Sequence, residues 1–414
     1  MIYFQPYENP MYFGVLFIAL IPIIVLILNG RRSKIYESII SIFFLFLTFG
    51  GPSWNQGVAL IIYTIYETVL TFAYSAYRKK ANKSWIFYLA VFLAVLPLTL
   101  VKISTATHDQ VQTLIGFLGI SYLTFRVVQT IMETRDGVIK NLNLITFLQF
   151  LLFFPTISSG PIDRYRRFEK DYNRVPKQDE YLEMLKKGIH YIFIGFLYKF
   201  ILAYITGTLM LPELKTMAMA QRGNFLGLSW PLLGVMYVYS ADLFFDFAGY
   251  SLFAVGTSHI LGINTPMNFN RPWQSLNIKD FWNRWHMSLS FWFRDYIYMR
   301  LLFMFMKKKT FKSRITAANV TYVLNMLIMG FWHGLTWYYI TYGLFHGLAI
   351  VINDAWLRFK KKHQEQIPHN QFTKYFAIFL TANIVCFSFL IFSGFLNQLW
   401  FSPVTTPKPH VKLK

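Results

Sequence analysis

The sequence contains few charged residues and a single cysteine. Of its 414 residues, 14% are Asp, Glu, Lys or Arg, whereas 55% are hydrophobic and 19% are aromatic. Soluble domains carry about 25% charged residues, so this composition predicts an integral membrane protein. With Cys386 alone, an intrachain disulfide is excluded, and neither a cysteine-based metal cluster nor a thiol nucleophile is indicated.

Several motifs of other enzyme classes are also missing. There is no glycine-rich phosphate-binding loop and no Gly-x-Ser-x-Gly turn, which disfavours ATP hydrolysis and serine-hydrolase chemistry. No His-x-x-x-His pair with a nearby Glu or Cys suggests zinc, so we expect no metal site.

Acidic residues are the scarcer charged type. Nineteen Asp and Glu stand against forty Lys and Arg, which gives a formal net charge of +21. Most basic residues form short runs beside apolar segments, and no long soluble basic region exists to hold DNA or RNA. We therefore expect no nucleic acid. The excess is typical of cytoplasmic loops that contact membrane lipids with anionic heads or an acidic protein partner.

Ten apolar runs are long enough to cross a bilayer, at roughly 17–25 residues each. No Lys or Arg precedes the first run, which is a poor start for a cleaved signal peptide, so we expect this run to be retained as a span. The runs lie near residues 11–28, 35–51, 57–77, 84–102, 114–132, 188–211, 230–262, 316–332, 336–357 and 374–399.

The basic runs predict the orientation, because Lys and Arg are enriched in cytoplasmic loops. Threading the spans alternately places every basic run inside and both termini outside, although Lys408, Lys412 and Lys414 argue against that side for the C-terminus. The loops near 50–57, 103–113 and 212–229 are poor in positive charge. The strongly basic runs are Arg31–Lys34, Arg78–Lys80, Arg164–Lys187, Lys307–Arg314 and Arg358–Lys362.

Two segments do not fit this alternation. Residues 144–157 are apolar but too short for a span, and they end in a stretch with two prolines and a glycine, which break helices. Residues 281–306 are aromatic but carry ionisable groups such as Arg294 and Asp295, which suit neither lipid nor a loop. We expect both segments to form short re-entrant or interfacial helices that line a cavity.

The predicted fold is therefore an all-α integral membrane protein with about 10–11 transmembrane helices plus re-entrant or interfacial helices. We expect a single transmembrane domain over residues 1–414. It would comprise N-terminal spans at 1–143, a core at 144–400 and a tail at 401–414.

Two histidines lie within hydrophobic stretches, His286 in Phe281–Asp295 and His333 in Gly330–Gly334. A titratable side chain at membrane depth is costly and usually faces a cavity or a partner. Imidazole also suits proton transfer near neutral pH. For an isolated histidine, a hydrogen-bonded core position is an equal alternative. His346, on the next helix, is predicted to be a packing residue.

Asp242 and Asp246 are four residues apart and therefore share one helix face. Paired carboxylates can relay protons, as in a transporter. The favoured alternative is that they cap or pair with arginines and backbone groups of the re-entrant elements. Gly249 beside Asp246 allows a close backbone approach.

A polar cluster, Asn283, Arg284 and His286, lies among the aromatic residues Trp282 and Trp285. These side chains could line a tunnel for a polar substrate, with arginine as an anion contact. The alternative is an interfacial aromatic belt with charged ends. Asn-Arg-x-His inside such a belt favours the tunnel.

Several stretches together resemble motifs of the membrane-bound O-acyltransferase family. They occur in the same order as in that family, over roughly 200 residues. The resemblance implies that family's fold, with helices around a central funnel. The matching stretches are Phe154–Phe168, Asp246–Ser251, Asn270–Trp273, Phe281–Tyr298, and Gly330–Gly334 with Gly343–Gly347.

Within the family, His286–Arg300 is most similar to the branch that attaches D-alanine to lipoteichoic acid at the plasma membrane of Gram-positive bacteria. Alginate-type O-acetyltransferases typically continue this motif with a Pro-Leu-Gly-Gly-like run, whereas here Leu301–Met306 follows. The resemblance implies that D-alanine moves from the 4′-phosphopantetheine thioester of a small acidic carrier protein to glycerol-phosphate hydroxyls outside. It suggests a small single-span accessory protein and no cofactor bound to the chain itself.

This resemblance, together with the residue chemistry, assigns roles. His333 would be the general base, and His286 would position the thioester or stabilise the oxyanion. A Met-rich apolar surface followed by lysines would dock the carrier protein. The predicted supporting and tunnel residues are His286, Asn283, Arg284, Trp282, Trp285, Ser290 and Asp246. The predicted docking residues are Arg300, Leu301, Met304, Phe305, Met306 and Lys307.

Other functions compete with this interpretation. O-acetylation of an exported polysaccharide is the alternative within the family. A transporter or flippase of cell-envelope precursors would explain the spans and the intramembrane charges, but not the joint occurrence of Trp332–Gly334 and the 281–298 cluster. A structural scaffold gives no reason to bury so many ionisable groups.

Overall fold

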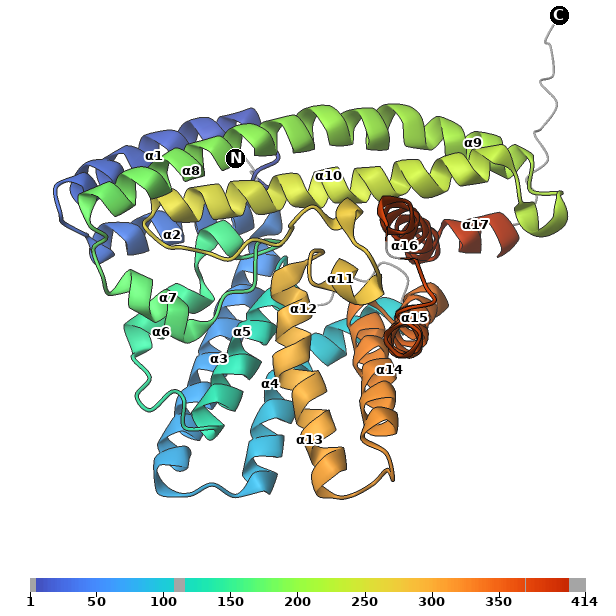
Figure 1. Cartoon of the computed structure of the whole chain (residues 1–414). Coiled ribbons are helices and arrows are strands. Elements are labelled where there is room, and N and C mark those ends of the chain that lie inside the picture. The colour runs from blue at the N-terminus through green and yellow to red at the C-terminus, as the bar shows by residue number, and fades with distance from the viewer. Residues whose placement is uncertain (1–4, 108–115, 369, 402–414) are drawn as a thin grey trace, which may run out of the picture.

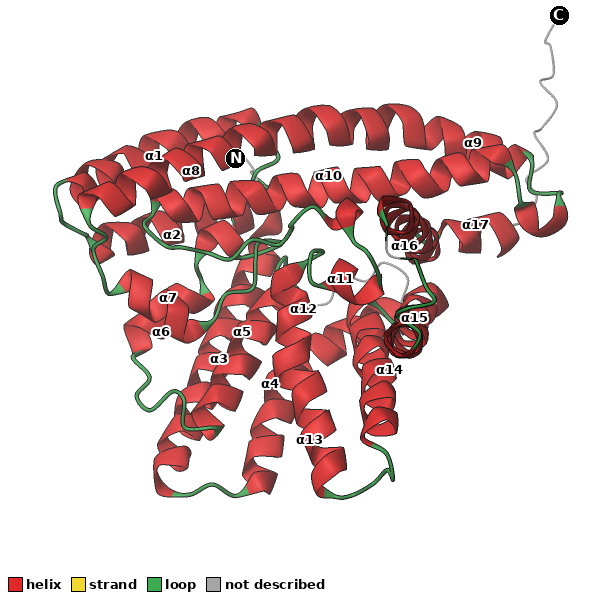
Figure 2. Ribbon diagram, viewed as in Figure 1, coloured by secondary structure: helices red, strands yellow, loops and turns green. Residues whose placement is uncertain are grey.

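The computed structural model describes residues 5–107, 116–368 and 370–401. Within these ranges every regular element is a helix and no strand occurs (Figure 2), so the predicted all-α class is confirmed. Some predicted features lie outside the described residues. These are most of the loop near 103–113, the first two residues of the span near 114–132, and the tail from residue 402 with its three lysines.

Long helices at both ends of the chain enclose short ones in the middle. The N-terminal elements are α1 (Pro10–Leu28), α2 (Lys34–Phe49), η1 (Gly51–Ser53), α3 (Trp54–Lys80), α4 (Ser84–Thr107) and α5 (Ile120–Arg135). The middle elements are α6 (Leu144–Leu151), η2 (Phe154–Thr156), α7 (Tyr165–Tyr172), α8 (Gln178–Phe196), η3 (Leu197–Leu202), η4 (Tyr204–Met210), α9 (Leu211–Ala220), η5 (Phe225–Gly227) and α10 (Trp230–Ile260). The C-terminal elements are η6 (Pro272–Gln274), α11 (Ile278–Trp282), α12 (Met287–Phe293), η7 (Arg294–Tyr298), α13 (Met299–Lys307), α14 (Arg314–His333), α15 (Trp337–Lys362), α16 (Gln371–Phe392) and α17 (Phe395–Phe401).

Eight helical segments of the described chain are long and apolar enough to cross a bilayer. They coincide with eight of the ten predicted spans. The other two predicted spans correspond to α2 and α5, which have 16 residues each. Because α5 carries the buried polar side chains Arg126, Gln129 and Glu133, it packs within the protein rather than against lipid.

The long helices run in several directions rather than as one parallel bundle. In Figure 1, α1, α8 and α10 cross the top of the view, whereas α3, α4, α5, α13 and α14 descend from them. Helices α15 and α16 are seen nearly end-on. Of the short helices, α11 lies below α10 and beside α15 and α16, α12 lies at the upper end of the descending α13, and α6 and α7 lie at the left of the view below α2.

Helices α8 and α10 pack closely because glycines face each other. A Cβ atom on Gly188 would lie 2.8 Å from the backbone oxygen of Gly256, and a Cβ on Gly256 would lie 2.7 Å from the oxygen of Gly188. Small residues allow helix backbones in membranes to approach in this way. The contact fixes α10, which carries both aspartates, against the helix that continues into η3.

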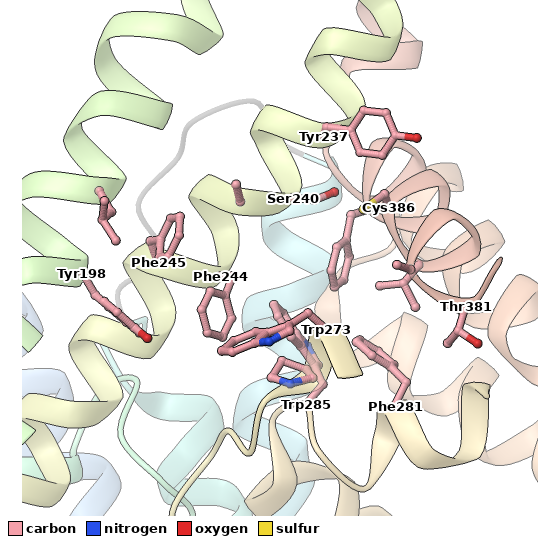
Figure 3. Close-up of a pocket in the computed structure, with 16 residues that line it drawn as sticks. Tyr198, Tyr237, Ser240, Phe244, Phe245, Trp273, Phe281, Trp285, Thr381 and Cys386 are labelled. Atoms are coloured by element: carbon pink, nitrogen blue, oxygen red, sulfur yellow. The ribbon is translucent and has the colours of Figure 1, made fainter. Parts of the chain in front are cut away.

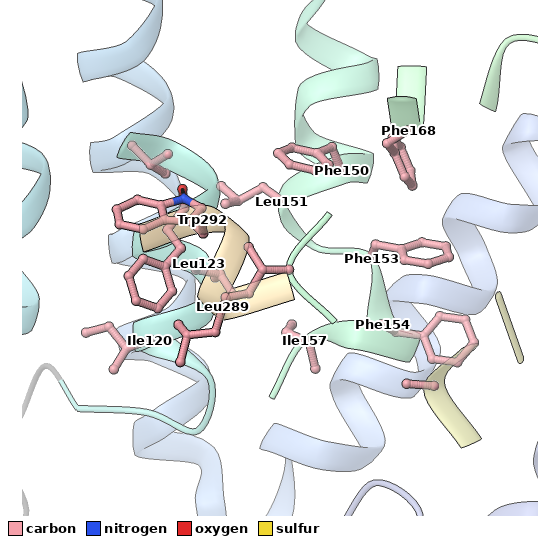
Figure 4. Close-up of a cluster of buried hydrophobic side chains, with 14 of the residues drawn as sticks. Ile120, Leu123, Phe150, Leu151, Phe153, Phe154, Ile157, Phe168, Leu289 and Trp292 are labelled. Carbon is pink, nitrogen blue, oxygen red and sulfur yellow. Dashed lines mark hydrogen bonds between the residues drawn. The ribbon is translucent and has the colours of Figure 1, made fainter. Parts of the chain in front are cut away.

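The short elements share one apolar core (Figure 4). Leu123 on α5, Leu151 on α6 and Leu289 on α12 are each exposed by 1% or less. The ring of Phe154 also stacks on Phe44 of α2, with 4.7 Å between the centroids. The helix-breaking stretch predicted after residue 153 is therefore fixed by side-chain packing from several helices.

A buried arginine holds the turn between α6 and η2. Arg126 is 1% exposed, and its Nη1 donates to the backbone oxygens of Phe150 and Leu151, both at 2.9 Å. Its Nη2 donates to the backbone oxygen of Thr156 at 2.7 Å. A cation is favourable at the C-terminal end of a helix, where carbonyl groups lack partners. Arg126 thus satisfies the irregular backbone that precedes the cavity-lining serines described below.

The prediction for residues 281–306 needs a correction. Helix α11 is short, as expected, but α12, η7 and α13 follow one another without a break from Met287 to Lys307. The physical reason is that these residues contain neither proline nor glycine, so nothing ends the helix. The polar groups at Arg294 and Asp295 lie in its π-helical part.

Candidate active site

The two predicted histidines line the same cavity. Its volume is about 390 Å³, and it is enclosed by the N-terminal segment, α5, the loop after η2, η3, α10, the start of α12 and the end of α14. The lining residues are Gln5, Pro6, Glu8, Leu118, Tyr122, Ser158, Ser159, Lys199, Asp246, Phe247, Tyr250, His286, Trp332 and His333.

His286 lies at the turn that leads into α12. Its backbone is left-handed, with φ 42° and ψ 51°, a conformation that is uncommon for a residue with a side chain and is found at functional sites. The imidazole is 5% exposed and meets the ring of Phe247 edge-on, with 4.6 Å between the centroids. Its Nε2 has no hydrogen-bond partner among the described residues.

The turn at His286 is anchored by the next two residues. The backbone N–H of Met287 donates to the oxygen of Asn268 at 2.8 Å. The Ser288 hydroxyl donates to Asn268 Oδ1 at 2.6 Å and accepts from the N–H of Ile162 at 2.9 Å. These bonds join α12 to the segment after α10 and to the loop after η2, so the imidazole has a fixed place.

His333 is the last residue of α14. The chain then turns at Gly334, where a Cβ atom would lie 2.6 Å from the ring of Tyr339. Its imidazole contacts the rings of Trp332 and Phe392, with centroids 4.5 Å and 4.9 Å away. The ammonium of Lys102 donates to the backbone oxygen of His333 at 2.9 Å, which places a cation at the C-terminal end of α14.

The two aspartates adjoin this cavity from α10. Asp246 accepts from the ammonium of Lys199 on η3 at 2.6 Å, and their side chains are 56% and 12% exposed. The expected partner was an arginine of the re-entrant elements, so this pairing differs from the prediction. A Cβ on Gly249 would lie 2.8 Å from Lys199 Cβ, which confirms the close approach predicted there. Asp242 accepts from the Thr206 hydroxyl at 3.4 Å.

A second polar cavity continues from the first. It has a volume of about 480 Å³, and it shares Glu8, Lys199 and Asp246 with the histidine cavity. Asp242 also lines it. Together the two cavities hold three carboxylates and one ammonium, which gives them an excess of negative charge near the histidines.

Charged side chains fix the loop that supplies Ser158 and Ser159. Asp163, further along this loop, is 4% exposed and forms an ion pair with Arg167. Burial raises the pKa of Asp163 above its usual range, and the guanidinium of Arg167 acts in the opposite direction. Gln129 donates to the backbone oxygen of Asp163 at 2.6 Å, which ties the loop to α5.

Most of the predicted tunnel residues lie elsewhere. Asp246 lines the histidine cavity. The described residues that line this cavity do not include the other predicted tunnel residues, which are Trp282, Asn283, Arg284, Trp285 and Ser290. The reason is that α11 ends at Trp282 and the chain turns before α12, so neighbours in sequence face different sides.

Each of these residues has contacts of its own. Trp282 Nε1 donates to Nδ1 of the buried His346 at 3.3 Å, and Arg284 pairs with Asp280 at 2.8 Å. The backbone N–H of Ser290 donates to the oxygen of His286 at 2.9 Å. Asn283 ends α11 as its C-cap.

Trp285 instead lines an apolar cavity of about 500 Å³ between α10, α11 and α16 (Figure 3). Phe244 and Trp273 lie close to Trp285 there, and Phe281 lies beside them. The titratable residues that line the histidine cavity, such as Glu8, Lys199 and Asp246, do not line this apolar cavity. Phe281 and Trp285 therefore line a separate, apolar cavity.

The predicted docking residues form the far end of the helix that begins beside His286. With a rise of 1.5 Å per residue, Lys307 lies about 30 Å along the helix from His286. Phe303 is 60% exposed and Lys307 is exposed, whereas Leu301, Met304 and Phe305 are half-buried. Met306 is also exposed, and Arg300 forms an ion pair with Asp136. Figure 1 shows α13 descending away from α8 and α10.

Three charged residues at or beside the site, Lys102, Lys199 and Glu8, were not predicted from the sequence. Lys102 is the only charged residue in the predicted span 84–102, and Lys199 is the only Asp, Glu, Lys or Arg in 188–211. The rule that selected the histidines, an ionisable group within an apolar run, would have selected both. Glu8 precedes the first helix and carries no such signal. Within the described ranges, no three His, Cys, Asp or Glu side chains gather as metal ligands would.

Comparison with known proteins identifies the family. Residues 79–395 match the model of the membrane-bound O-acyltransferase family. The chain is 59% identical over 406 residues to the teichoic acid D-alanyltransferase of Lacticaseibacillus rhamnosus, covering 97% of this chain and 100% of that protein. It is 48% identical to the Bacillus subtilis protein of the same name, covering 94% and 98%.

A second group of relatives matches over a shorter region. The probable alginate O-acetylase of Azotobacter vinelandii is 33% identical over 239 residues, which are 58% of this chain and 44% of that protein. From the family match and the near full-length relatives, the chain belongs to the membrane-bound O-acyltransferase family.

Proposed function

We propose that this enzyme transfers D-alanine to lipoteichoic acid. The donor is the 4′-phosphopantetheine thioester of a cytoplasmic carrier protein, and the acceptors are glycerol-phosphate hydroxyls at the outer face of the bacterial plasma membrane. The similarity to teichoic acid D-alanyltransferases over almost the whole chain supports this function. The observation that carries the mechanism is that two imidazoles, on segments almost fifty residues apart, line one cavity.

His333 is the proposed general base. As the acceptor hydroxyl oxygen attacks the thioester carbonyl, the imidazole of His333 takes the hydroxyl proton. The tetrahedral intermediate then expels the pantetheine thiolate, which receives that proton from the imidazolium, so the ester and a free thiol are the products. General-base assistance of this kind contributes roughly 10²–10⁴-fold to the rate.

His286 is the proposed supporting residue. An oxyanion is stabilised by hydrogen-bond donors that are already in place before the reaction. The Nε2 atom of His286 has no partner among the described residues, while its backbone is fixed by the bonds around Ser288. A neutral imidazole with hydrogen on Nε2 would donate to the developing oxyanion.

The charges around the cavity favour an aminoacyl donor. A D-alanyl group carries an ammonium, which an acetyl group lacks. Over the histidine cavity and the polar cavity that adjoins it, Glu8, Asp242 and Asp246 outnumber Lys199, so an ammonium would find carboxylate partners there. The ammonium of Lys102, which donates to the backbone oxygen of His333, is a cation beside the proposed base, where we place the phosphates of the acceptor. An acetyl donor would use none of the acidic groups.

Carrier docking is proposed for the exposed end of α13. Arg300, Leu301, Met304, Phe305, Met306 and Lys307 combine apolar and basic side chains there. Flexible methionines adapt to a partner surface, and lysines attract an acidic protein. A small single-span protein as an assistant is proposed from the family resemblance alone.

The test uses cells that lack their native D-alanyltransferase and express this chain or its variants. Ester-linked D-alanine on lipoteichoic acid is released with mild base and quantified by mass spectrometry, and immunoblots check membrane levels. The wild type should restore the ester, and His333→Gln should lower it at least 10²-fold. His363→Gln, a histidine beyond the end of α15, is the matched control and should behave as the wild type.

Each other outcome contradicts a distinct part of the proposal. Equal ester levels with His333→Gln would exclude His333 as the base. If the wild type is present in the membrane but restores no D-alanine ester, the donor assignment is wrong. An acetyl ester in place of D-alanine would favour the O-acetylation alternative.

A further inference from the structure

A wide groove of the described chain lies between α15 and α16. Its volume is about 900 Å³, within the range of ligand sites in proteins. It shares no lining residue with the histidine cavity. We propose that this groove binds an anionic glycerophospholipid of the inner leaflet, and this inference does not depend on the proposed function.

Most of the groove is apolar and open to the lipid phase. Ile352 and Trp356 on α15 are 70% and 51% exposed, and Leu380 on α16 is 48% exposed. Ala349 and Ala377 leave space between the two helices. Side chains of this kind on membrane-spanning helices are suited to acyl chains, which have no polar groups to satisfy.

One end of the groove is polar and basic. Lys360 at the end of α15 and Lys374 at the start of α16 both line it, together with Asn370 and Thr373. Asn370 Oδ1 accepts from the backbone N–H of Thr373 at 2.9 Å, so its amide nitrogen is directed to other partners. The Thr373 hydroxyl donates to the backbone oxygen of Asn370 at 2.9 Å, so the two ammonium groups and the Asn370 amide nitrogen are the donors for a headgroup phosphate.

The two lysines are not neutralised by the protein. No ion pair in the described ranges joins Lys360 or Lys374 to a carboxylate, whereas Asp354 of α15 is paired with Lys279 and Arg358. Between residues 353 and 374 there are five Lys or Arg and two Asp or Glu. The charge at this end of the groove therefore complements a phosphate.

The side of the membrane follows from the same residues. Helix α15 ends in the basic run Arg358–Lys362, which the distribution of positive charge places in the cytoplasm. The inner leaflet presents anionic headgroups to basic pockets between helices. The apolar part of the groove matches the acyl chains of such a lipid, and the two ammonium groups at the inner surface match its headgroup phosphate.

The groove also contacts the segment that leads to the active site. Asn277, which lines it, accepts from the N–H of Asp280 at 3.0 Å and so caps α11. Asn353 on α15 donates to the same Asn277 oxygen at 3.5 Å. A bound lipid would therefore hold α15, α16 and the start of α11 together.

Native mass spectrometry of the purified full-length protein tests this proposal. Phosphatidylglycerol and phosphatidylcholine with identical acyl chains are added to the detergent-solubilised protein, and bound lipid is counted at each concentration. We expect one phosphatidylglycerol to bind in preference to phosphatidylcholine. Lys360→Gln with Lys374→Gln should weaken this binding by on the order of tenfold.

The matched control is Lys361→Gln with Lys362→Gln, which removes the same charge from the exposed end of α15 and leaves the groove intact. This control should bind phosphatidylglycerol as the wild type does. Ala377→Trp fills the apolar part and should abolish the preferred binding while both lysines remain. Lys360→Arg with Lys374→Arg should retain it, which separates loss of charge from misfolding.

Four results would overturn the proposal. The first is equal binding of the two lipids by the wild type. The second is an equal loss in the groove variant and its control, which would indicate general surface charge. The third is unchanged lipid binding in Ala377→Trp, which would leave the groove to another apolar partner such as a single-span helix. Displacement of the lipid by glycerol phosphate alone would assign the site to a free phosphate and would also reject it.

Discussion

At the scale of single residues, His286 combines an unfavourable backbone with a fixed side chain. A left-handed residue other than glycine costs about 1–3 kcal/mol and persists only where its surroundings impose it. Here the bonds of Met287 and Ser288 to Asn268, and the contact with Phe247, impose it. The imidazole is therefore oriented before any substrate binds, as catalysis by fixed dipoles requires.

This conformation predicts an order of stability among variants. Both His286→Gly and His286→Ala should lower the D-alanine ester level, because each removes the imidazole. His286→Gly should be more stable than His286→Ala by about 1 kcal/mol, since glycine adopts φ 42° without the steric cost of a Cβ. Thermal unfolding of the purified variants measures this difference. An alanine variant at least as stable as the glycine variant would mean that the turn relaxes.

At the scale of elements, the contact between α8 and α10 is too close to accept a side chain larger than that of glycine at Gly188 or Gly256. The facing glycines let η3 carry Lys199 to Asp246, so the helix packing determines the charges beside the histidines. The π-helical pieces η3 and η4 continue α8 along α10 in the same region. Such departures from the α-helix are frequent at functional sites.

One methyl group at this contact should be costly. Gly256→Ala would place a Cβ 2.7 Å from the oxygen of Gly188, so the helices must separate, and overpacking of this kind costs about 1–3 kcal/mol. The expected result is a lower midpoint of thermal unfolding. Gly14→Ala on α1 is the matched control, because its Cβ would have no neighbour within 4 Å. It should leave the midpoint unchanged or raise it slightly. A Gly256 variant as stable as this control would contradict the close packing.

The elements also explain what the sequence could predict. Hydrophobic runs located the eight helical segments of the described residues that are long enough to span, because burial in lipid requires continuous apolar surface. Short helices were expected for the 281–306 segment because it is too polar for lipid and too apolar for a loop, whereas residues 287–307, which lack proline and glycine, form one continuous helix. The pairing of Asp246 with Lys199 was not predictable from spacing, since it depends on how two helices cross.

At the scale of the whole molecule, the orientation in the membrane determines whether the proposed lipid groove and the proposed docking surface face the cytoplasm. The lysine end of the α15–α16 groove and the predicted docking surface on α13 both belong to basic segments, which predicts one cytoplasmic side for both. Of the residues that line the site, the sequence indicated the two histidines and Asp246. Its other lining residues come from segments spread over the chain, and local patterns contain no information about such neighbours.

Single-cysteine labelling tests this orientation. With Cys386→Ser as the background, Asn224→Cys should react with a membrane-impermeant maleimide in intact cells, because its loop is poor in positive charge. Lys361→Cys should react only after the membrane is permeabilised. Both positions are exposed in the structure, so accessibility depends on the side of the membrane. The reverse pattern would invert the topology and move the lysine groove to the outer leaflet.

The lining of the histidine cavity extends from Gln5 to His333, which has a consequence for synthesis. A chain still emerging from the ribosome has the first wall of the cavity long before the last. Until α14 has been inserted, His333 is missing and the other lining residues have no reaction to perform. With His333 as the proposed base, an unfinished chain would be unable to discharge the proposed carrier protein, and activity would begin only when nearly the whole protein is in the membrane.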